Sequence, residues 1–218
     1  MHIAIDGPAG AGKSTVARLL ARRLNYIYVD TGSMYRAVTL RALQSGVELE
    51  EGSALTELAR RTAIDFVVGE NAQRVLCDGE DVTEAIRSPQ VSASVSKAAA
   101  RPELRAVMVA KQRAVAQERD VVMDGRDIGE VVLPQADYKF FITADINTRS
   151  RRRQLEMTAQ GYTVDQAEVK RDLEQRDNMD ASRPVGALKL LPDSIVINTS
   201  DLSVDEVLEQ ILARMGLA

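Results

Sequence analysis

The chain has 218 residues and a net charge of −4, with 45% hydrophobic and 28% charged residues. This length and composition predict one substantial globular domain, with any further segment inserted into it. The negative net charge argues against a nucleic-acid or membrane-surface partner. No apolar run approaches the ~20 residues that span a bilayer. One cysteine (Cys77) and one histidine (His2) exclude an internal disulfide and a His/Cys metal site, and they favour a reducing cytoplasm. The chain enters a loop motif almost at once, so no signal peptide is expected.

Short β-like runs alternate with helical runs along most of the chain. The predicted strands cover residues 2–6, 26–30, 120–124, 138–142 and 194–198. The predicted helices cover residues 14–24, 32–44, 54–63, 102–117, 147–160, 164–177 and 204–215, the last of them capped by Ser203. This alternation predicts a three-layer α/β fold with a parallel sheet.

The middle of the chain breaks the alternation. Residues 64–68 and 74–77 are β-like runs, and the turn-rich stretch 69–73 joins them. Two strands so close together predict an antiparallel hairpin. We therefore interpret residues 64–97 as an insertion in the α/β fold.

A glycine-rich loop follows the first predicted strand. Its sequence fits G-x-x-x-x-G-K-[ST] at every specified position: Gly7-Pro8-Ala9-Gly10-Ala11-Gly12-Lys13-Ser14. Glycines allow positive φ and turn backbone N–H groups inward, and the following helix N-terminus adds a positive dipole. Lys13 is expected to reach the β- and γ-phosphates, and Ser14 to give its hydroxyl to Mg²⁺. The motif predicts a nucleoside triphosphate site.

A second charged segment ends the strand predicted at 120–124. It runs Asp124-Gly-Arg126-Asp127-Ile-Gly. An arginine beside a phosphate loop suits charge stabilisation of a transferred phosphoryl group. The simpler alternative is that Asp124 alone holds a water on Mg²⁺ and the rest forms a turn. The guanine-reading N-K-x-D element of GTPases is absent from the sequence.

Four segments together resemble the bacterial cytidylate kinase family. They are the phosphate loop through Thr15, Asp30-Thr-Gly-Ser-Met-Tyr-Arg36, the Asp124 segment, and Arg176-Asp-Asn-Met-Asp180-Ala-Ser-Arg183. Residues 76–83 also resemble the inserted β segment of that family, whereas the Asp-Gly-Phe-Pro-Arg hallmark of adenylate kinases is missing at Asp124. The resemblance implies a P-loop fold with a parallel five-stranded sheet and a monomeric state. It implies a core of residues 1–31 and 98–218, a nucleoside-monophosphate-binding region at about 32–97 and a lid at about 150–183.

The resemblance also implies roles for individual residues. ATP would contact the whole phosphate loop from Gly7 to Thr15, with Arg149 and Arg153 closing over its phosphates. The residues implied in catalysis are Lys13, Arg126, Arg176, Asp180 and Arg183. The residues implied in binding CMP or dCMP are Thr31, Arg36, Ser96, Arg105, Arg126, Asp127, Arg176, Asp180 and Arg183.

The chemistry of cytosine agrees with part of this set. Cytosine offers an N4 amino donor and acceptors at N3 and O2. Ser96 and Asp127 can accept from the amino group, and Arg105 can donate to the acceptors. Uracil reverses the polarity at two positions, so we expect UMP to be a poor substrate. Other small-molecule P-loop kinases, and a nucleotide-dependent switch protein, remain as alternative interpretations.

Overall fold

The computed structural model describes residues 1–50, 52–68, 73–117 and 119–217. It divides into two compact units, one formed by residues 1–28 with 118–218 and the other by residues 29–117. The sequence prediction instead returned to the core at residue 98, and its domain boundaries remain a prediction.

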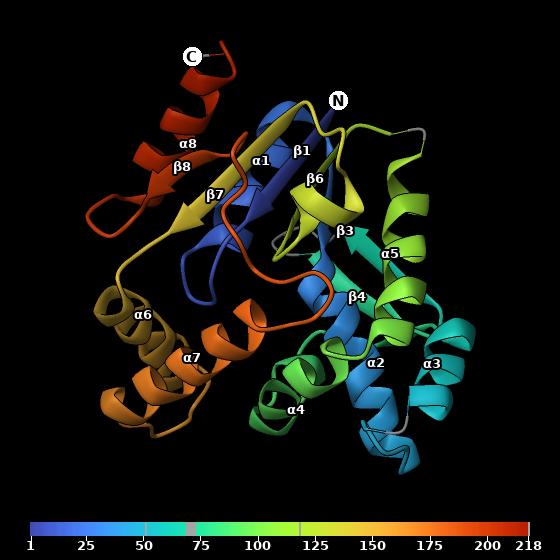
Figure 1. Cartoon of the computed structure of the whole chain (residues 1–218). Helices are drawn as coiled ribbons and strands as arrows, with labels where there is room; N and C mark the ends of the chain where they lie inside the picture. The colour runs from blue at the N-terminus through green and yellow to red at the C-terminus, as the bar shows by residue number, and fades with distance from the viewer. Residues whose placement is uncertain (51, 69–72, 118, 218) are drawn as a thin grey trace. The chain divides into compact units, whose positions relative to one another are not determined.

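The first unit is built on a five-stranded parallel sheet with helices on both sides, as predicted (Figure 1). Its strand order is β2-β6-β1-β7-β8, so the first strand of the chain lies in the centre. The strands are β1 (His2–Asp6), β2 (Ile27–Asp30), β6 (Val121–Gly125), β7 (Tyr138–Thr143) and β8 (Ile195–Asn198). Asp6 pairs in register with Gly125 of β6 and with Phe141 of β7. The ends of three neighbouring strands therefore meet where the phosphate loop begins.

The helices of this unit are α1 (Lys13–Leu24), α6 (Ile146–Ala159), α7 (Gln166–Ala181) and α8 (Val204–Arg214). A π-helical segment, η2 (Ile128–Val132), follows β6. The apolar sides of α1 and α8 pack on one face of the sheet, around Ile5 and Phe140. The predicted cap of the last helix is confirmed, because Ser203 and Glu206 form a capping box.

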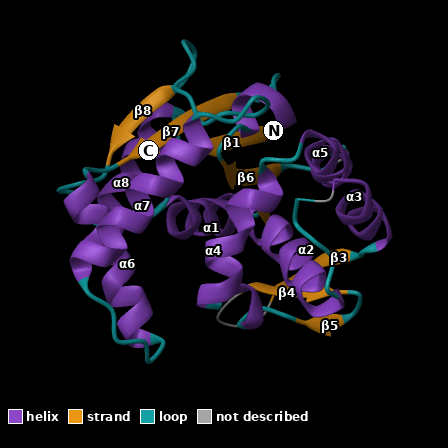
Figure 2. Ribbon diagram, turned by 60° about the horizontal axis from the view of Figure 1, so that its bottom comes forward, coloured by secondary structure: helices purple, strands orange, loops and turns teal. Residues whose placement is uncertain are grey.

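The second unit combines four helices with a small antiparallel sheet. The helices are α2 (Thr31–Ser45), α3 (Gly52–Arg61), α4 (Pro89–Ala99) and α5 (Pro102–Ala116), and the 3₁₀ segment η1 covers Ala85–Arg87. The sheet has the order β3-β4-β5, with β3 (Ile64–Val68), β4 (Gln73–Cys77) and β5 (Glu80–Asp81) next to α2 (Figure 2). The predicted hairpin is thus confirmed with Ile64 opposite Cys77, while most of its predicted turn, 69–72, lies outside the described residues.

The sequence interpretation missed helix α4. Its start signal is local, because the Ser88 side chain accepts a hydrogen bond from the Val91 amide and Pro89 takes the first helical position. The core of this unit gathers apolar side chains of α2, β4 and α4, among them Leu40 and Val91. The single cysteine, Cys77, is fully buried in this core. Residues 64–97 are therefore a hairpin, a short third strand and a helix.

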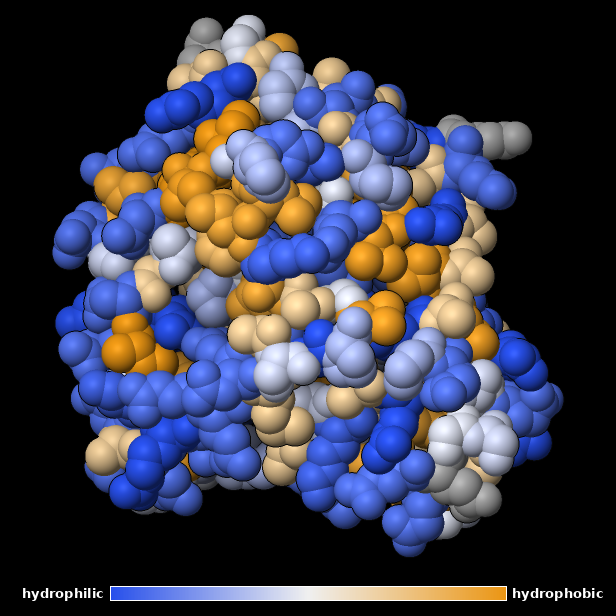
Figure 3. Space-filling model, viewed as in Figure 1, coloured by the Kyte–Doolittle hydropathy of each residue, from blue (hydrophilic) through white to orange (hydrophobic). Residues whose placement is uncertain are grey.

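The visible surface is mainly hydrophilic with apolar patches between the charged residues (Figure 3). Exposed large apolar side chains include Leu190 and Val196. Among the described residues, no helix has the length and apolar character that crossing a bilayer requires.

Candidate active site

The loop between β1 and α1 has the backbone geometry that its glycines predict. Gly7, Gly10 and Gly12 have φ values of 146°, 76° and 92°. A Cβ on Gly7 would also lie 1.9 Å from the carbonyl oxygen of Ile142 in β7. Glycine is therefore required at position 7 twice over, by the positive φ and by the close approach of a neighbouring strand.

Lys13 is buried at the start of α1, with 5% of its surface exposed. Its Nζ donates a hydrogen bond to the carbonyl oxygen of Pro8 at 2.7 Å, so the lysine folds back across the loop. Burial and the positive charge of Arg126 lower the pKa of Lys13 to about 7, although the nearby Asp124 opposes this change. The surroundings of Lys13 thus make its amine easier to deprotonate than a lysine in water.

Ser14 and Asp124 form a small oxygen site beside the loop. The Ser14 hydroxyl donates to Oδ2 of Asp124 at 2.8 Å, and the Tyr28 hydroxyl donates to Oδ1 at 2.9 Å. Hydroxyl and carboxylate oxygens suit Mg²⁺, which takes few protein ligands when phosphates and waters complete its octahedron. These residues therefore fit the expected metal. No cluster of three or more His, Cys, Asp or Glu that would hold a metal by itself exists among the described residues.

A buried carboxylate organises the predicted catalytic arginines. Asp180, only 1% exposed, accepts a hydrogen bond from Nε of Arg126 at 2.7 Å and pairs with Arg183. Burial alone would raise the pKa of Asp180, but the charges of Arg126, Arg183 and Arg176 hold it below its usual value. Arg126 and Arg176 also act electrostatically on Lys13. The structure therefore brings all five predicted catalytic residues into one electrostatic network.

The two predicted arginines of α6 have different surroundings. Arg149 is buried and donates through Nη1 to the carbonyl oxygen of Ala9 in the loop at 3.1 Å and to Asp177 at 2.5 Å. Arg153 instead pairs with Glu156 of its own helix at 2.7 Å. Arg149 thus reaches the phosphate loop directly, whereas Arg153 is held along α6.

The sequence interpretation missed the role of Asp6, the last residue of β1. Its two carboxylate oxygens accept hydrogen bonds from the amides of Ile128 and Gly129, both at 2.8 Å. Burial raises the pKa of Asp6 to about 6, and the nearby charge of Asp127 adds to this effect. Asp6 thereby fixes the backbone directly after Asp127. The sequence signal that could have identified Asp6 is an acidic residue at the junction between a buried strand and a phosphate loop.

In the second unit, the predicted acceptor residues begin on α2. Thr31 is its first residue and is 3% exposed. Nη1 of Arg36 donates to the Ser92 hydroxyl of α4 at 2.9 Å and to the carbonyl oxygen of Ile86 at 3.3 Å. The residues of α2 and α4 are therefore joined by the side chain that was predicted to bind the acceptor phosphate.

The predicted base-reading residues of this unit are also buried. Ser96 lies on α4, one helical turn after Ser92, and is 6% exposed. Arg105 on α5 is 2% exposed, and its guanidinium lies 5.6 Å from the centre of the Tyr35 ring. Buried Ser and Arg side chains of this kind are not the solvated surface groups that residue type alone would suggest.

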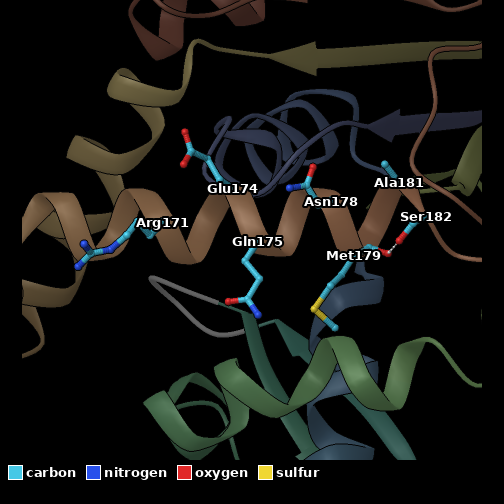
Figure 4. Close-up of a pocket in the computed structure, with 7 residues that line it drawn as sticks. All are labelled: Arg171, Glu174, Gln175, Asn178, Met179, Ala181 and Ser182. Carbon is cyan, nitrogen blue, oxygen red and sulfur yellow. Dashed lines mark hydrogen bonds between the residues drawn. The ribbon is translucent and has the colours of Figure 1, made fainter.

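One open depression, of about 730 Å³, lies on α7 (Figure 4). Gln175 and Met179 project from the same side of the helix, and the Ser182 hydroxyl donates to the Met179 carbonyl oxygen at 3.4 Å. The residues lining the depression are Arg171, Glu174, Gln175, Asn178, Met179, Ala181 and Ser182. None of them is a predicted site residue, so we assign no substrate to it.

A parallel sheet, a glycine loop with a buried lysine and a serine–aspartate oxygen pair define a nucleotide-binding protein of the P-loop class. Comparison with known proteins narrows this class. A family model described as cytidylate kinase matches residues 3–216. The chain therefore belongs to the cytidylate kinase family.

Curated relatives agree over nearly the full length. A cytidylate kinase of Symbiobacterium thermophilum is 51% identical over 211 residues, covering 96% of this chain and 93% of that protein. A cytidylate kinase of a Geobacillus species is 48% identical over 212 residues, covering 97% and 95%. Among solved structures, the shikimate kinase of Bacteroides thetaiotaomicron has a TM-score of 0.52 at 16% identity, covering 100% of this chain and 99% of that one. This structural likeness shows the fold alone.

Proposed function

We propose that this protein is a cytidylate kinase that transfers the γ-phosphoryl group of ATP to CMP or dCMP, giving ADP with CDP or dCDP. The observation that carries the proposal is the electrostatic network of Lys13, Asp124 and Arg126, which joins the phosphate loop to the segment after β6. Membership of the cytidylate kinase family supports the choice of acceptor.

On the donor side, the loop from Gly7 to Thr15 binds the ATP phosphates. Backbone amides surround the phosphate oxygens, while Lys13 contacts the β- and γ-phosphates. Arg149 stabilises the loop from α6 through the Ala9 carbonyl. Arg153 would have to leave Glu156 before it could contact ATP. Residues of about 150–183 form the lid that excludes water, because an open site would hydrolyse ATP.

Mg²⁺ is the implied cofactor, and Ser14 with Asp124 would hold it. When bound, it would supply positive charge to the phosphates and offset the charge that develops during transfer. The carboxylate of Asp124 already accepts hydrogen bonds from two hydroxyls, so its orientation is set before any metal arrives.

The acceptor nucleotide is bound through its phosphate, its sugar and its base. Thr31 and Arg36 contact its phosphate and sugar, with Arg126 and Arg183 as further phosphate ligands. Arg176 and Asp180 contact the ribose or the transferring phosphate. Since the attacking group is an ionised phosphate, no strong general base is needed, and the positioned guanidiniums stabilise the in-line transition state.

Cytosine is recognised by Ser96, Arg105 and Asp127 through the donor and acceptor pattern of its edge. The burial of all three side chains supports this assignment, because a desolvated polar group discriminates strongly against a base that leaves it unpaired. We place the enzyme in the cytoplasm as a monomer, with no nucleic-acid or membrane partner.

Single acceptors test the proposal directly. ADP release is measured with Mg²⁺ and ATP and with CMP, dCMP, UMP, AMP, shikimate or no acceptor. Rapid release with CMP and dCMP alone is the expected result, whereas release without any acceptor would favour a switch protein. Arg105→Ala and Asp127→Ala are expected to lose CMP turnover while binding of ATP stays largely intact. Normal CMP turnover in both variants would contradict the cytosine assignment.

A further inference from the structure

The backbone of the phosphate loop is held from outside by a residue that the activity described above does not use. Thr199 follows β8, is 3% exposed, and donates its hydroxyl to the carbonyl oxygen of Ala11 at 3.0 Å. Its own amide donates to the Thr143 carbonyl at the end of β7 at 2.7 Å. Thr199 is therefore fixed to the sheet and reaches the loop 188 positions earlier in the chain.

Arg152 of α6 determines the direction of this hydroxyl. Its Nη1 donates to Oγ1 of Thr199 at 2.9 Å, and its Nη2 donates to the Thr199 carbonyl oxygen at 2.6 Å. A guanidinium only donates, so Oγ1 must accept from Arg152. The one proton of the hydroxyl is then directed to Ala11.

The peptide bond between Ala11 and Gly12 is a rigid plane in which the carbonyl and the N–H point in opposite directions. Holding the Ala11 oxygen toward Thr199 therefore fixes the direction of the Gly12 N–H. Gly12 has φ 92° and no Cβ, so its own conformational preference does not fix the peptide. The hydrogen bond from Thr199 supplies such a constraint from outside the loop.

We propose that Thr199, oriented by Arg152, is a positioning residue that holds the Gly12 amide ready for the ATP phosphates. This inference rests on the proposed function, because it assumes that the loop binds ATP. Without the Thr199 hydroxyl the loop samples other peptide orientations, and ATP binding bears the free-energy cost of ordering them. The acceptor residues of the second unit are not part of this contact, so the effect is specific to ATP.

The test compares Thr199→Val with Thr199→Ser. Valine keeps the β-branched shape but removes the hydroxyl, whereas serine keeps the hydroxyl. Loss of one such hydrogen bond predicts a KM for ATP and a Kd for MgATP raised about five- to tenfold in Thr199→Val. The KM for CMP should stay within about twofold of wild type. Thr199→Ser should restore ATP affinity to near the wild-type value.

A second variant covers the case in which Thr199→Val does not fold. Arg152→Met keeps an apolar stem and removes the guanidinium, and it should raise the KM for ATP in the same direction. Arg23→Met is the matched control, since it removes the same charge from an exposed position in the last turn of α1, outside the lid, and should leave both KM values unchanged.

The positioning role is refuted by unchanged ATP affinity in Thr199→Val and, should that variant not fold, in Arg152→Met. It is also refuted by failure of serine to restore ATP affinity, or by a parallel rise in both KM values. A wild-type enzyme that releases no ADP with CMP would instead refute the proposed function. The two failures are therefore distinguishable.

Discussion

The buried position of Lys13 predicts that ATP binding takes up a proton. Its pKa of about 7 in the free protein results first from burial and then from Arg126. A bound triphosphate places several negative charges beside the amine and raises that pKa toward its usual value. At pH 8 only about one tenth of the free protein carries the proton on Lys13, so binding should take up about 0.9 proton. At pH 6 the uptake should fall to about 0.1 proton, because the amine is already charged.

Isothermal titration calorimetry measures this uptake. MgATP is titrated into the protein without acceptor at fixed pH, in buffers with different ionisation enthalpies, and the slope of observed heat against buffer enthalpy gives the number of protons. Lys13→Met is the control, because it keeps much of the stem but has no group to titrate. A slope near zero at pH 8 in the wild type, or the same slope in Lys13→Met, would contradict the reasoning.

Three stability predictions follow from other contacts. The pKa of Asp6 is raised from 3.8 to about 6. The folded state therefore binds more protons than the unfolded state between these values, and Asp6 should cost about 3 kcal/mol of stability as pH rises through this window. Urea unfolding of Asp6→Asn should lack that part of the decline, and an identical pH profile would count against the assignment. Asp180→Ala leaves two largely buried guanidiniums without their carboxylate and should lower the free energy of unfolding by about 3 kcal/mol, measured by urea titration at pH 7. A loss below about 1 kcal/mol would show that the cluster behaves like a surface ion pair. Gly7→Ala should cost about 3 kcal/mol or more because its Cβ would meet the Ile142 oxygen, whereas Gly46→Ala, with φ 66° and open space around it, should cost only about 1 kcal/mol. Equal midpoints of thermal unfolding for these two variants would refute the steric argument.

The sequence predicted the parallel sheet because its signals are local. Each buried strand is a short apolar run, and each helix shows its own periodicity or cap, so no knowledge of distant partners is needed. The phosphate-loop motif is also a local signal, since its glycines are required by the backbone of that loop itself. Helix α4 was missed although Ser88 and Pro89 mark its start, because the hairpin before it suggested that residues 64–97 were a β insertion.

The parts of the site that were missed depend on pairing across the fold. Asp6 accepts from amides more than 120 positions away, and Arg152 finds Thr199 at a separation of 47 residues. Nothing in the local pattern of α6 indicates which of its arginines faces the phosphate loop. The structure shows Arg149 bonded to the Ala9 carbonyl of the loop, Arg152 bonded to Thr199, and Arg153 paired with Glu156, although the three arginines lie within five positions of one helix. The roles of the site residues toward ATP and CMP remain predictions.

The one thiol of the chain can report the local opening of the second unit. Cys77 is fully buried, and burial raises the pKa of its thiol, so both water and thiolate-directed reagents are excluded while the unit is closed. Modification by a thiol reagent must then wait for the core around β4 to open, and its rate measures the free energy of that local opening. Because no second cysteine competes, the natural sequence already carries the label needed to follow how this unit opens in the presence and absence of nucleotides.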